Sequence, residues 1–206
     1  MGVDKKAALR KARKLQEVLE TGQSIFTGKD PIREFDSACD HVIQLLRDSH
    51  NLFNLGSFAT SLFLAITALE EKTKIEVSFF RPRESSDAIN RKGDPLFSHK
   101  QKHAIALPEV LLIGGRLETA IGEKRVRDFL NMAEKGGFVT LRESALYIDR
   151  GNTGLKLPES EIDKATARAV LLLAIEAAND SFTGGTDHSW EIGNELDSMF
   201  TQVYDS

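Results

Sequence analysis

The sequence predicts an all-α protein, a bundle of four to five main helices, and three observations support this. Apolar residues recur every three or four positions over several long stretches, as on one face of a helix. Turn-forming segments separate these stretches. The 206 residues are enough to bury one core. Extended structure is expected only near 138–149, where short β-branched or aromatic segments predict strands or a small hairpin.

Three helices are expected in the first half of the chain. A mostly polar helix is predicted over 5–20, followed by a second over 32–52, where Asp30 is placed to cap the N-terminus. The third and most apolar helix is predicted over 58–80. It should end there, because Pro82 disfavours helical geometry in the residue before it.

The second half begins with a polar, turn-rich loop predicted over 82–98. Helical patterns then follow over 99–113 and 117–133, and a last core helix is predicted to run through 162–176. The segment 183–206 has no clear place in this pattern. The predicted organisation is a basic N-terminal helix and linker over 1–30, a helical bundle over 31–182 and an acidic tail from 183 to the end.

Charge and cysteine content narrow the class of protein. The net charge of −4 argues against a protein that coats nucleic acid through a globally basic surface. A single cysteine, Cys39, cannot form an intramolecular disulfide and fits a reducing compartment. The N-terminus lacks the apolar region of a signal peptide, and no apolar run could span a bilayer. We therefore expect a cytoplasmic protein without membrane contact.

Two short polar stretches beside apolar runs form the candidate site. Each stretch contains three ionisable residues of interest. The first contains Glu70, Glu71 and Lys74, and the second contains His99, Lys102 and His103. Residues three and four apart share one face of a helix, so each stretch can present its groups together where two helices meet.

The chemistry of these groups leaves alternatives open. Histidines four residues apart can bind zinc, but no third ligand of a common zinc motif accompanies them, so neither a metal nor a cofactor is expected. Imidazoles can transfer protons near neutral pH, and lysines can stabilise phosphate charge. The plainest alternatives are an exposed salt bridge on the first helix and solvated histidines on the second.

Four motifs, in their order and spacing over about 33–178, resemble the AbiV family of abortive-infection proteins, part of the HEPN superfamily. They are Gly56-Ser57-Phe58-Ala59-Thr60, then Ala65-Ile66-Thr67-Ala68-Leu69-Glu70-Glu71-Lys72-Thr73-Lys74, then His99-Lys100-Gln101-Lys102, and finally Arg142-Glu143-Ser144-Ala145-Leu146-Tyr147-Ile148-Asp149. The resemblance implies a HEPN-like bundle, often a homodimer with active residues at a shared cleft. It also implies antiphage defence, a toxin–antitoxin context and, in many relatives, metal-independent endoribonuclease activity.

The resemblance carries over to individual residues. Glu70, Glu71 and Lys74 match the Glu-Glu-x-x-Lys helix, His99 and Lys102 match the His-x-x-Lys helix, and Tyr147 lies in the Leu-Tyr-Ile-Asp segment. The chain departs from the usual HEPN nuclease signature, an arginine followed after four to six residues by a histidine. Seven residues separate Arg91 from His99, and Lys92 has the right spacing but lacks the planar fork of arginine. Arg91, Lys92, Arg142 and Tyr147 are the candidate substrate-binding residues.

The leading hypothesis is an RNA-cleaving defence effector with His99 or His103 as acid or base. Lys102 and Lys74 would then stabilise phosphate charge, and Glu70 or Glu71 would orient these groups. The competing hypothesis is a non-catalytic interaction protein that binds a phage or host partner, with an antitoxin as another expected partner. Nucleotide transfer or sensing is a third, weaker option.

Overall fold

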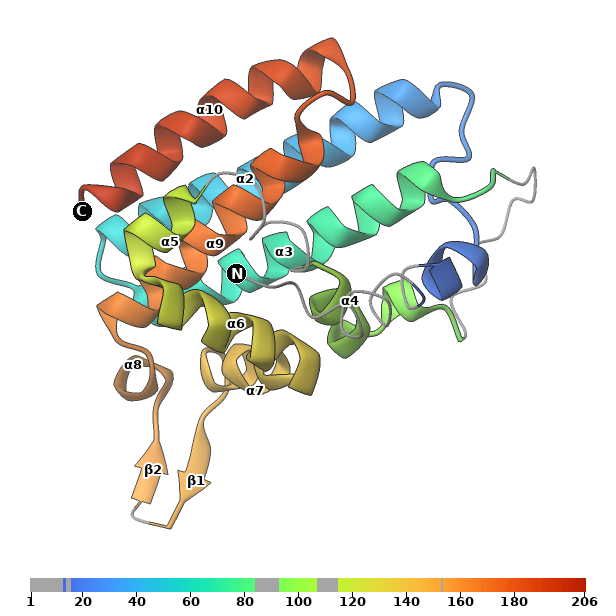
Figure 1. Cartoon of the computed structure of the whole chain (residues 1–206). Coiled ribbons are helices and arrows are strands. Elements are labelled where there is room, and N and C mark those ends of the chain that lie inside the picture. Colours follow the sequence, from blue (N-terminus) through green and yellow to red (C-terminus); the bar gives the residue numbers. More distant parts are fainter. Residues whose placement is uncertain (1–12, 14–15, 84–92, 107–114, 153) are drawn as a thin grey trace.

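The computed structural model describes residues 13, 16–83, 93–106, 115–152 and 154–206, and it confirms the predicted all-α bundle (Figure 1). Its five main helices are α2 (Pro31–Asn54), α3 (Phe58–Phe80), α6 (Glu123–Lys135), α9 (Lys164–Phe182) and α10 (Asp187–Tyr204). The long helices α2, α3, α9 and α10 run alongside one another, with α3 against both α2 and α9.

Shorter elements connect these helices. They are η1 (Pro95–Phe97), α4 (His99–Ala106), α5 (Arg116–Ile121), α7 (Gly137–Ser144), α8 (Pro158–Glu161) and the strands β1 (Asp149–Gly151) and β2 (Gly154–Lys156). Residues 16–20 are also helical. Of the predicted first helix, residues 5–12 and 14–15 lie outside the described residues, as do 84–92 of the predicted loop and 107–113 of the helix predicted from 99.

Local sequence signals fix the ends of the long helices as expected. Oδ1 of Asp30 accepts a hydrogen bond from the backbone N–H of Arg33, 3.1 Å away, and Pro31 occupies the first turn of α2. Helix α3 ends at Phe80, where Arg81 takes an extended conformation before Pro82.

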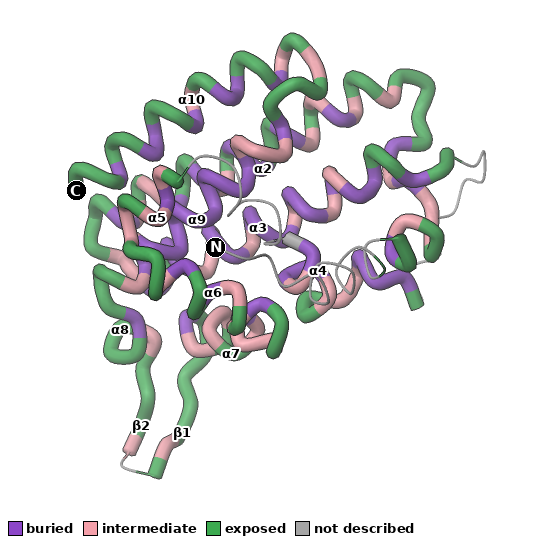
Figure 2. Tube along the Cα trace, viewed as in Figure 1, coloured by how far each residue is buried: buried purple, intermediate pink, exposed green. Residues whose placement is uncertain are grey.

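The core lies between α2, α3 and α9 (Figure 2). Helix α9 is buried on nearly every side from Ala169 to Ala178, which explains why this stretch is apolar without an amphipathic period. Aromatic side chains link the helices, because Phe35 of α2 contacts Phe79 of α3 and Phe182 of α9. The core therefore holds α3, the helix that carries the first candidate stretch, in a fixed orientation.

The segment predicted as extended is largely helical. Residues 138–144 belong to α7, and the hairpin begins only at Asp149, where Asp149 pairs with Lys156 in antiparallel register. Phe138 explains the difference, because its ring is fully buried and contacts Phe129 of α6 and His103 of α4. Tertiary packing on these two helices outweighs the strand preference of a short aromatic segment.

The segment predicted as an acidic tail is part of the bundle. Residues 187–204 form α10, which packs on α9 and α2 and buries Leu196 and Val203 completely. Thr186 caps this helix, since its hydroxyl accepts a hydrogen bond from the backbone N–H of Ser189. The acidic residues lie on the outer face, where Glu195 pairs with Arg47 of α2 at 2.5 Å. A boundary at 183 would divide one continuous core.

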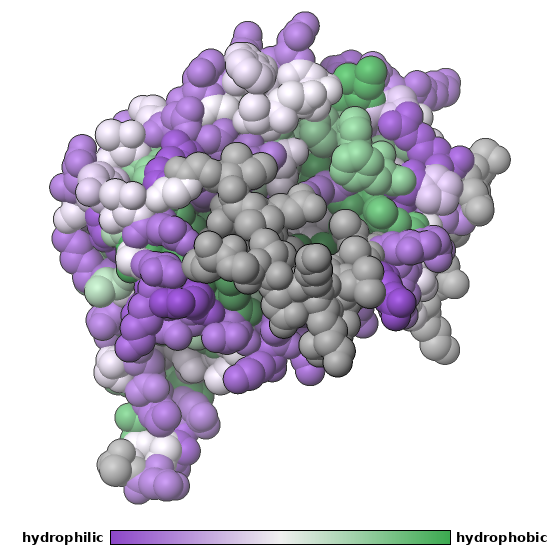
Figure 3. Space-filling view, viewed as in Figure 1, coloured by the Kyte–Doolittle hydropathy of each residue, from purple (hydrophilic) through white to green (hydrophobic). Residues whose placement is uncertain are grey.

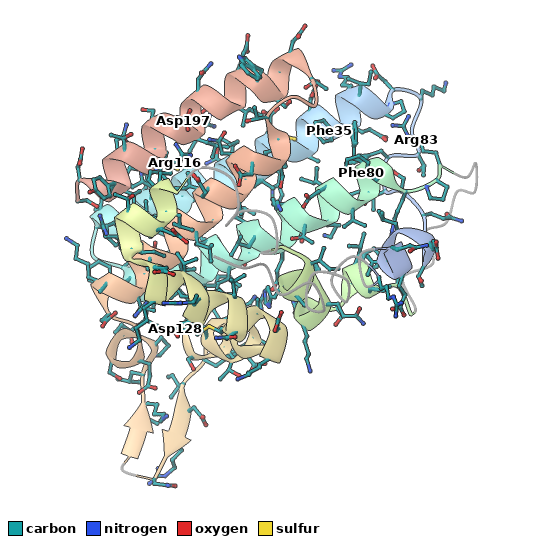
Figure 4. The ribbon with its side chains drawn as sticks, viewed as in Figure 1. Phe35, Phe80, Arg83, Arg116, Asp128 and Asp197 are labelled. Atoms are coloured by element: carbon teal, nitrogen blue, oxygen red, sulfur yellow. The ribbon has the colours of Figure 1, made fainter. Side chains whose placement is uncertain are left out.

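The surface visible in Figure 3 is mostly hydrophilic. Its hydrophobic atoms gather near the end of α3, where Figure 4 labels Phe80. Phe80 is 69% exposed, and its ring contacts that of Phe79, which in turn contacts Phe35 of α2. None of the described helices is both long and apolar enough to cross a membrane.

Candidate functional site

The carboxylate of Glu70 lies at the centre of the candidate site, on the face of α3 that α4 and α7 cover. Oε2 of Glu70 is 2.6 Å from Nδ1 of His99 and 3.1 Å from Nζ of Lys102. Oε1 lies 2.9 Å from Nε2 of His103, off the line of a well-formed hydrogen bond, and 3.8 Å from Nε of Arg142. Four basic side chains therefore surround one buried carboxylate.

Electrostatics keep Glu70 ionised despite its burial. Burial alone would raise the pKa of Glu70, but the contact with His103, the charge of Lys102 and the hydrogen bond with His99 lower this pKa to about 2. The side chains of Glu70, Lys102 and His103 are only 3%, 6% and 1% exposed. A charge this deep is tolerated because it is paired.

Glu71 extends the group toward solvent. Its Oε1 lies 3.7 Å from Nζ of Lys102, and its Oε2 pairs with Nζ of Lys74. Lys74 therefore pairs with Glu71, three residues before it, rather than with Glu70. We call the connected group the Glu70 cluster, and its members are Glu70, Glu71, Lys74, His99, Lys102, His103 and Arg142.

His99 is the most exposed member of the Glu70 cluster, so its ring can reach a substrate. Its side chain is 50% exposed, whereas that of His103 is 1% exposed. Because Nδ1 of His99 is held by Glu70, Nε2 is the ring nitrogen left to exchange a proton outside the protein. A carboxylate behind an imidazole fixes the orientation of the ring.

A buried ion pair that sequence reasoning missed holds the start of α4. The guanidinium of Arg81 binds both carboxylate oxygens of Asp94, at 2.7 and 2.8 Å, and also donates to the backbone oxygen of Val18. Oδ1 of Asp94 in turn accepts from the backbone N–H of Leu96 in η1. This pair joins the end of α3 to the segment just before His99, and thereby sets where α4 begins.

The other substrate-binding predictions have different outcomes. Arg142 reaches Glu70 and stacks over the ring of Phe63 at 4.7 Å, so it is part of the Glu70 cluster. Tyr147 is 60% exposed just before the hairpin, outside the contacts that form the cluster. Arg91 and Lys92 lie outside the described residues. The described residues contain no group of His, Cys, Asp or Glu side chains arranged to hold a metal ion.

The family model HEPN_AbiV, described as AbiV, matches residues 32–178, which is more than half of the chain. The chain belongs to the AbiV family. AbiV proteins act in abortive infection, so this chain is a defence protein of that class. Neither a curated protein nor a solved structure matches the chain.

The AbiV match also shows how the family domain relates to the fold. It runs from the first turn of α2 into α9 and contains all seven residues of the Glu70 cluster. It ends before α10, although α10 packs on both α9 and α2. In this AbiV protein the last helix therefore completes the core from outside the matched region.

Proposed function

We propose that this AbiV protein defends against phage as a metal-independent endoribonuclease that cleaves host or phage RNA at the Glu70 cluster. The observation that carries the proposal is the contact between His99 and Glu70, at 2.6 Å, with His99 half exposed. A carboxylate-oriented imidazole at the surface, beside two lysines, supplies a proton-transfer group and positive charge.

The reaction that fits these groups is attack by the ribose 2′-hydroxyl on the adjacent phosphorus. A base takes the 2′ proton, the bond from phosphorus to the 5′ oxygen breaks, and an acid protonates that oxygen. The products are a 2′,3′-cyclic phosphate and a 5′-hydroxyl. Nε2 of His99 is the proposed acid or base. Lys74, which is 20% exposed, stabilises the charge on the phosphate directly, and Lys102, which is 6% exposed, adds positive charge from beneath the surface.

His103 has a different role in this scheme. Its ring is 1% exposed, so it positions Glu70 rather than touching RNA. Cleavage needs both an acid and a base, and His99 is the one surface imidazole of the described Glu70 cluster. We place the second imidazole on another copy of the chain, in a homodimer whose two α4 helices face one cleft.

The proposal is tested by incubating the purified protein with total RNA and identifying the cleaved ends. We expect 2′,3′-cyclic phosphate ends in the presence of a metal chelator, and their loss in His99→Ala and Lys102→Ala. Sedimentation of the same samples should show a dimer. Cleavage that survives both substitutions would refute the site, and a monomer that cleaves RNA would refute the shared cleft.

The second candidate function is a non-catalytic protein that binds a phage or host partner, such as an antitoxin. The burial of Glu70, Lys102 and His103 favours it, because buried ion networks also occur purely as supports of a fold. If no RNA is cleaved in any condition while one partner co-purifies and blocks growth arrest, the binding function replaces the nuclease.

A further inference from the structure

A pocket between α9 and α10, separate from the Glu70 cluster, has the features of a ligand site. It has a volume of about 360 Å³, within the range of roughly 300 to 1,000 Å³ that small-molecule sites occupy. We call it the Asp180 pocket, and the residues of its wall that matter here are Asn179, Asp180, Thr183, Trp190, Gly193 and Asp197.

The helices approach closely at this pocket because of a glycine. A Cβ atom on Gly193 of α10 would lie 3.2 Å from Oγ1 of Thr183 and 3.3 Å from Oδ1 of Asn179. The side chain of Asn179 also donates to Oδ1 of Asp197, at 2.8 Å. Polar groups of α9 and α10 are therefore held together in one wall of the pocket.

The carboxylate of Asp180 is the unusual member of this wall. It makes no hydrogen bond or ion pair with any described residue, and its Oδ2 atom is buried. Burial, followed by the charge of Glu176, raises the pKa of Asp180 to about 7, although Lys72 and Arg116 act in the opposite direction. A partly buried acid without a partner requires an explanation, since most such groups are satisfied.

The charged groups around Asp180 are unequal in number. Those in the described residues are four carboxylates and two cations, namely Glu76, Glu176, Asp180 and Asp197 against Lys72 and Arg116. Both cations already pair with other acids, Lys72 with Glu76 at 2.7 Å and Arg116 with Asp197 at 2.5 Å. Figure 4 shows Arg116 and Asp197 side by side where α5 approaches α10. Two negative charges remain unmatched when all four acids are ionised.

The remaining feature of the wall is an exposed aromatic ring. Trp190 is 59% exposed and lines the pocket with Asp180. Indole is the aromatic side chain that attracts cations most strongly, and a nearby carboxylate adds direct charge pairing.

We propose that the Asp180 pocket binds an organic cation with a guanidinium or primary ammonium group, seated between the ring of Trp190 and the carboxylate of Asp180. This inference does not depend on the nuclease proposal, because the Glu70 cluster shares no residue with the pocket. The cation supplies the positive charge that the described residues around Asp180 lack.

Trp190 makes the proposal directly measurable, because it is the single tryptophan of the chain. The full-length protein is titrated with agmatine, which carries one guanidinium and one ammonium group, at pH 8 and constant ionic strength. We expect a saturable change in tryptophan fluorescence, and weaker binding at pH 6, where Asp180 is largely protonated.

Substitutions then locate the site. Asp180→Asn keeps the shape and removes the charge, so we expect binding to weaken about tenfold or more. Asp128→Asn is the matched control, because Asp128 lies on the exposed face of α6, away from Asp197 in Figure 4, and should bind agmatine as the unsubstituted protein does. His99→Ala should also bind normally, which separates this result from any outcome of the RNA assay.

The source of the cation is distinguished by comparing probes. Tighter binding of agmatine or putrescine than of a blocked arginine peptide identifies a free small cation, and the reverse order identifies a side chain of a partner protein. Trp190→Phe, followed by calorimetry, should retain weaker binding. No saturable signal with any of these probes, or equal affinity in Asp180→Asn, would overturn the proposal.

Discussion

The Nδ1 atom of His99 lies 2.6 Å from Oε2 of Glu70, although the two residues are 29 positions apart in the chain. This contact fixes α4 on α3 and leaves the other ring nitrogen of His99 available at the surface. The carboxylate of Glu70 therefore has two roles, because it stabilises the fold and also orients His99 for the proposed chemistry. The two roles predict different consequences for the residues around Glu70.

Removing the charge of Glu70 should destabilise the protein. Glu70→Gln leaves Lys102 and His103 buried without their common counter-charge, and breaking a buried pair from one side costs about 3 kcal/mol or more. Chemical unfolding should measure this loss. The control is Lys156→Gln, because Lys156 of the hairpin pairs with Glu161 of α8 at the surface. We expect this substitution to change the free energy of unfolding by less than about 1 kcal/mol.

The pKa of Glu70 predicts loss of stability in acid. Because folding lowers this pKa from 4.5 to about 2, the stabilisation is fully present above pH 4.5 and disappears as the pH falls toward 2. Its size is about 3 kcal/mol near neutral pH. Urea unfolding at pH 6 and pH 3 should show the difference, and Glu70→Gln should lack this contribution. An identical acid dependence in both proteins would contradict the assignment.

The two histidines should separate stability from function. His103→Ala removes a buried ring that contacts Glu70 and Phe138, so we expect a loss of about 1 to 3 kcal/mol. His99→Ala changes a half-exposed ring and should cost less than about 1 kcal/mol. Thermal unfolding measures both. Equal destabilisation by the two substitutions would argue that His99 is a structural residue.

Asp180 predicts a stability change of opposite sign. Folding raises its pKa from 3.8 to about 7, so its contribution lowers stability as the pH rises from about 4 through 7. Asp180→Asn removes this effect and should stabilise the protein at pH 8 by about 1 kcal/mol or more, while changing little at pH 4. Stabilisation at pH 4 that equals the value at pH 8 would show that ionisation of Asp180 is not the cause.

Much of the fold follows from local sequence signals. The apolar spacing along α2 and α3, the cap at Asp30 and the stop before Pro82 are all local, and they placed both long helices. The approach of His99 to Glu70 is a tertiary contact, but helical spacing had already grouped the residues that make it. The sequence therefore predicts which residues form the Glu70 cluster, but not the distances between them.

Contacts between distant segments explain what the sequence did not reveal. The helix at 137–144 depends on Phe138 packing against α6 and α4, and local pattern alone favoured a strand. Helix α10 carries acidic residues on its outer face, so the composition of this segment indicates an acidic tail. Its apolar residues become evident only from their contacts with α9. The pair of Arg81 with Asp94 joins residues whose neighbours give no periodic signal. Each of these features is defined by its partner rather than by its own sequence.

RNA cleavage by matched variants decides whether His99, held by Glu70, is the proton-transfer group of a nuclease. We expect His99→Ala to abolish the formation of 2′,3′-cyclic phosphate ends, while His41→Ala, on the exposed face of α2, cleaves RNA at the original rate. Both variants should remain folded. Cleavage by His99→Ala at the same rate as by His41→Ala would contradict the claim.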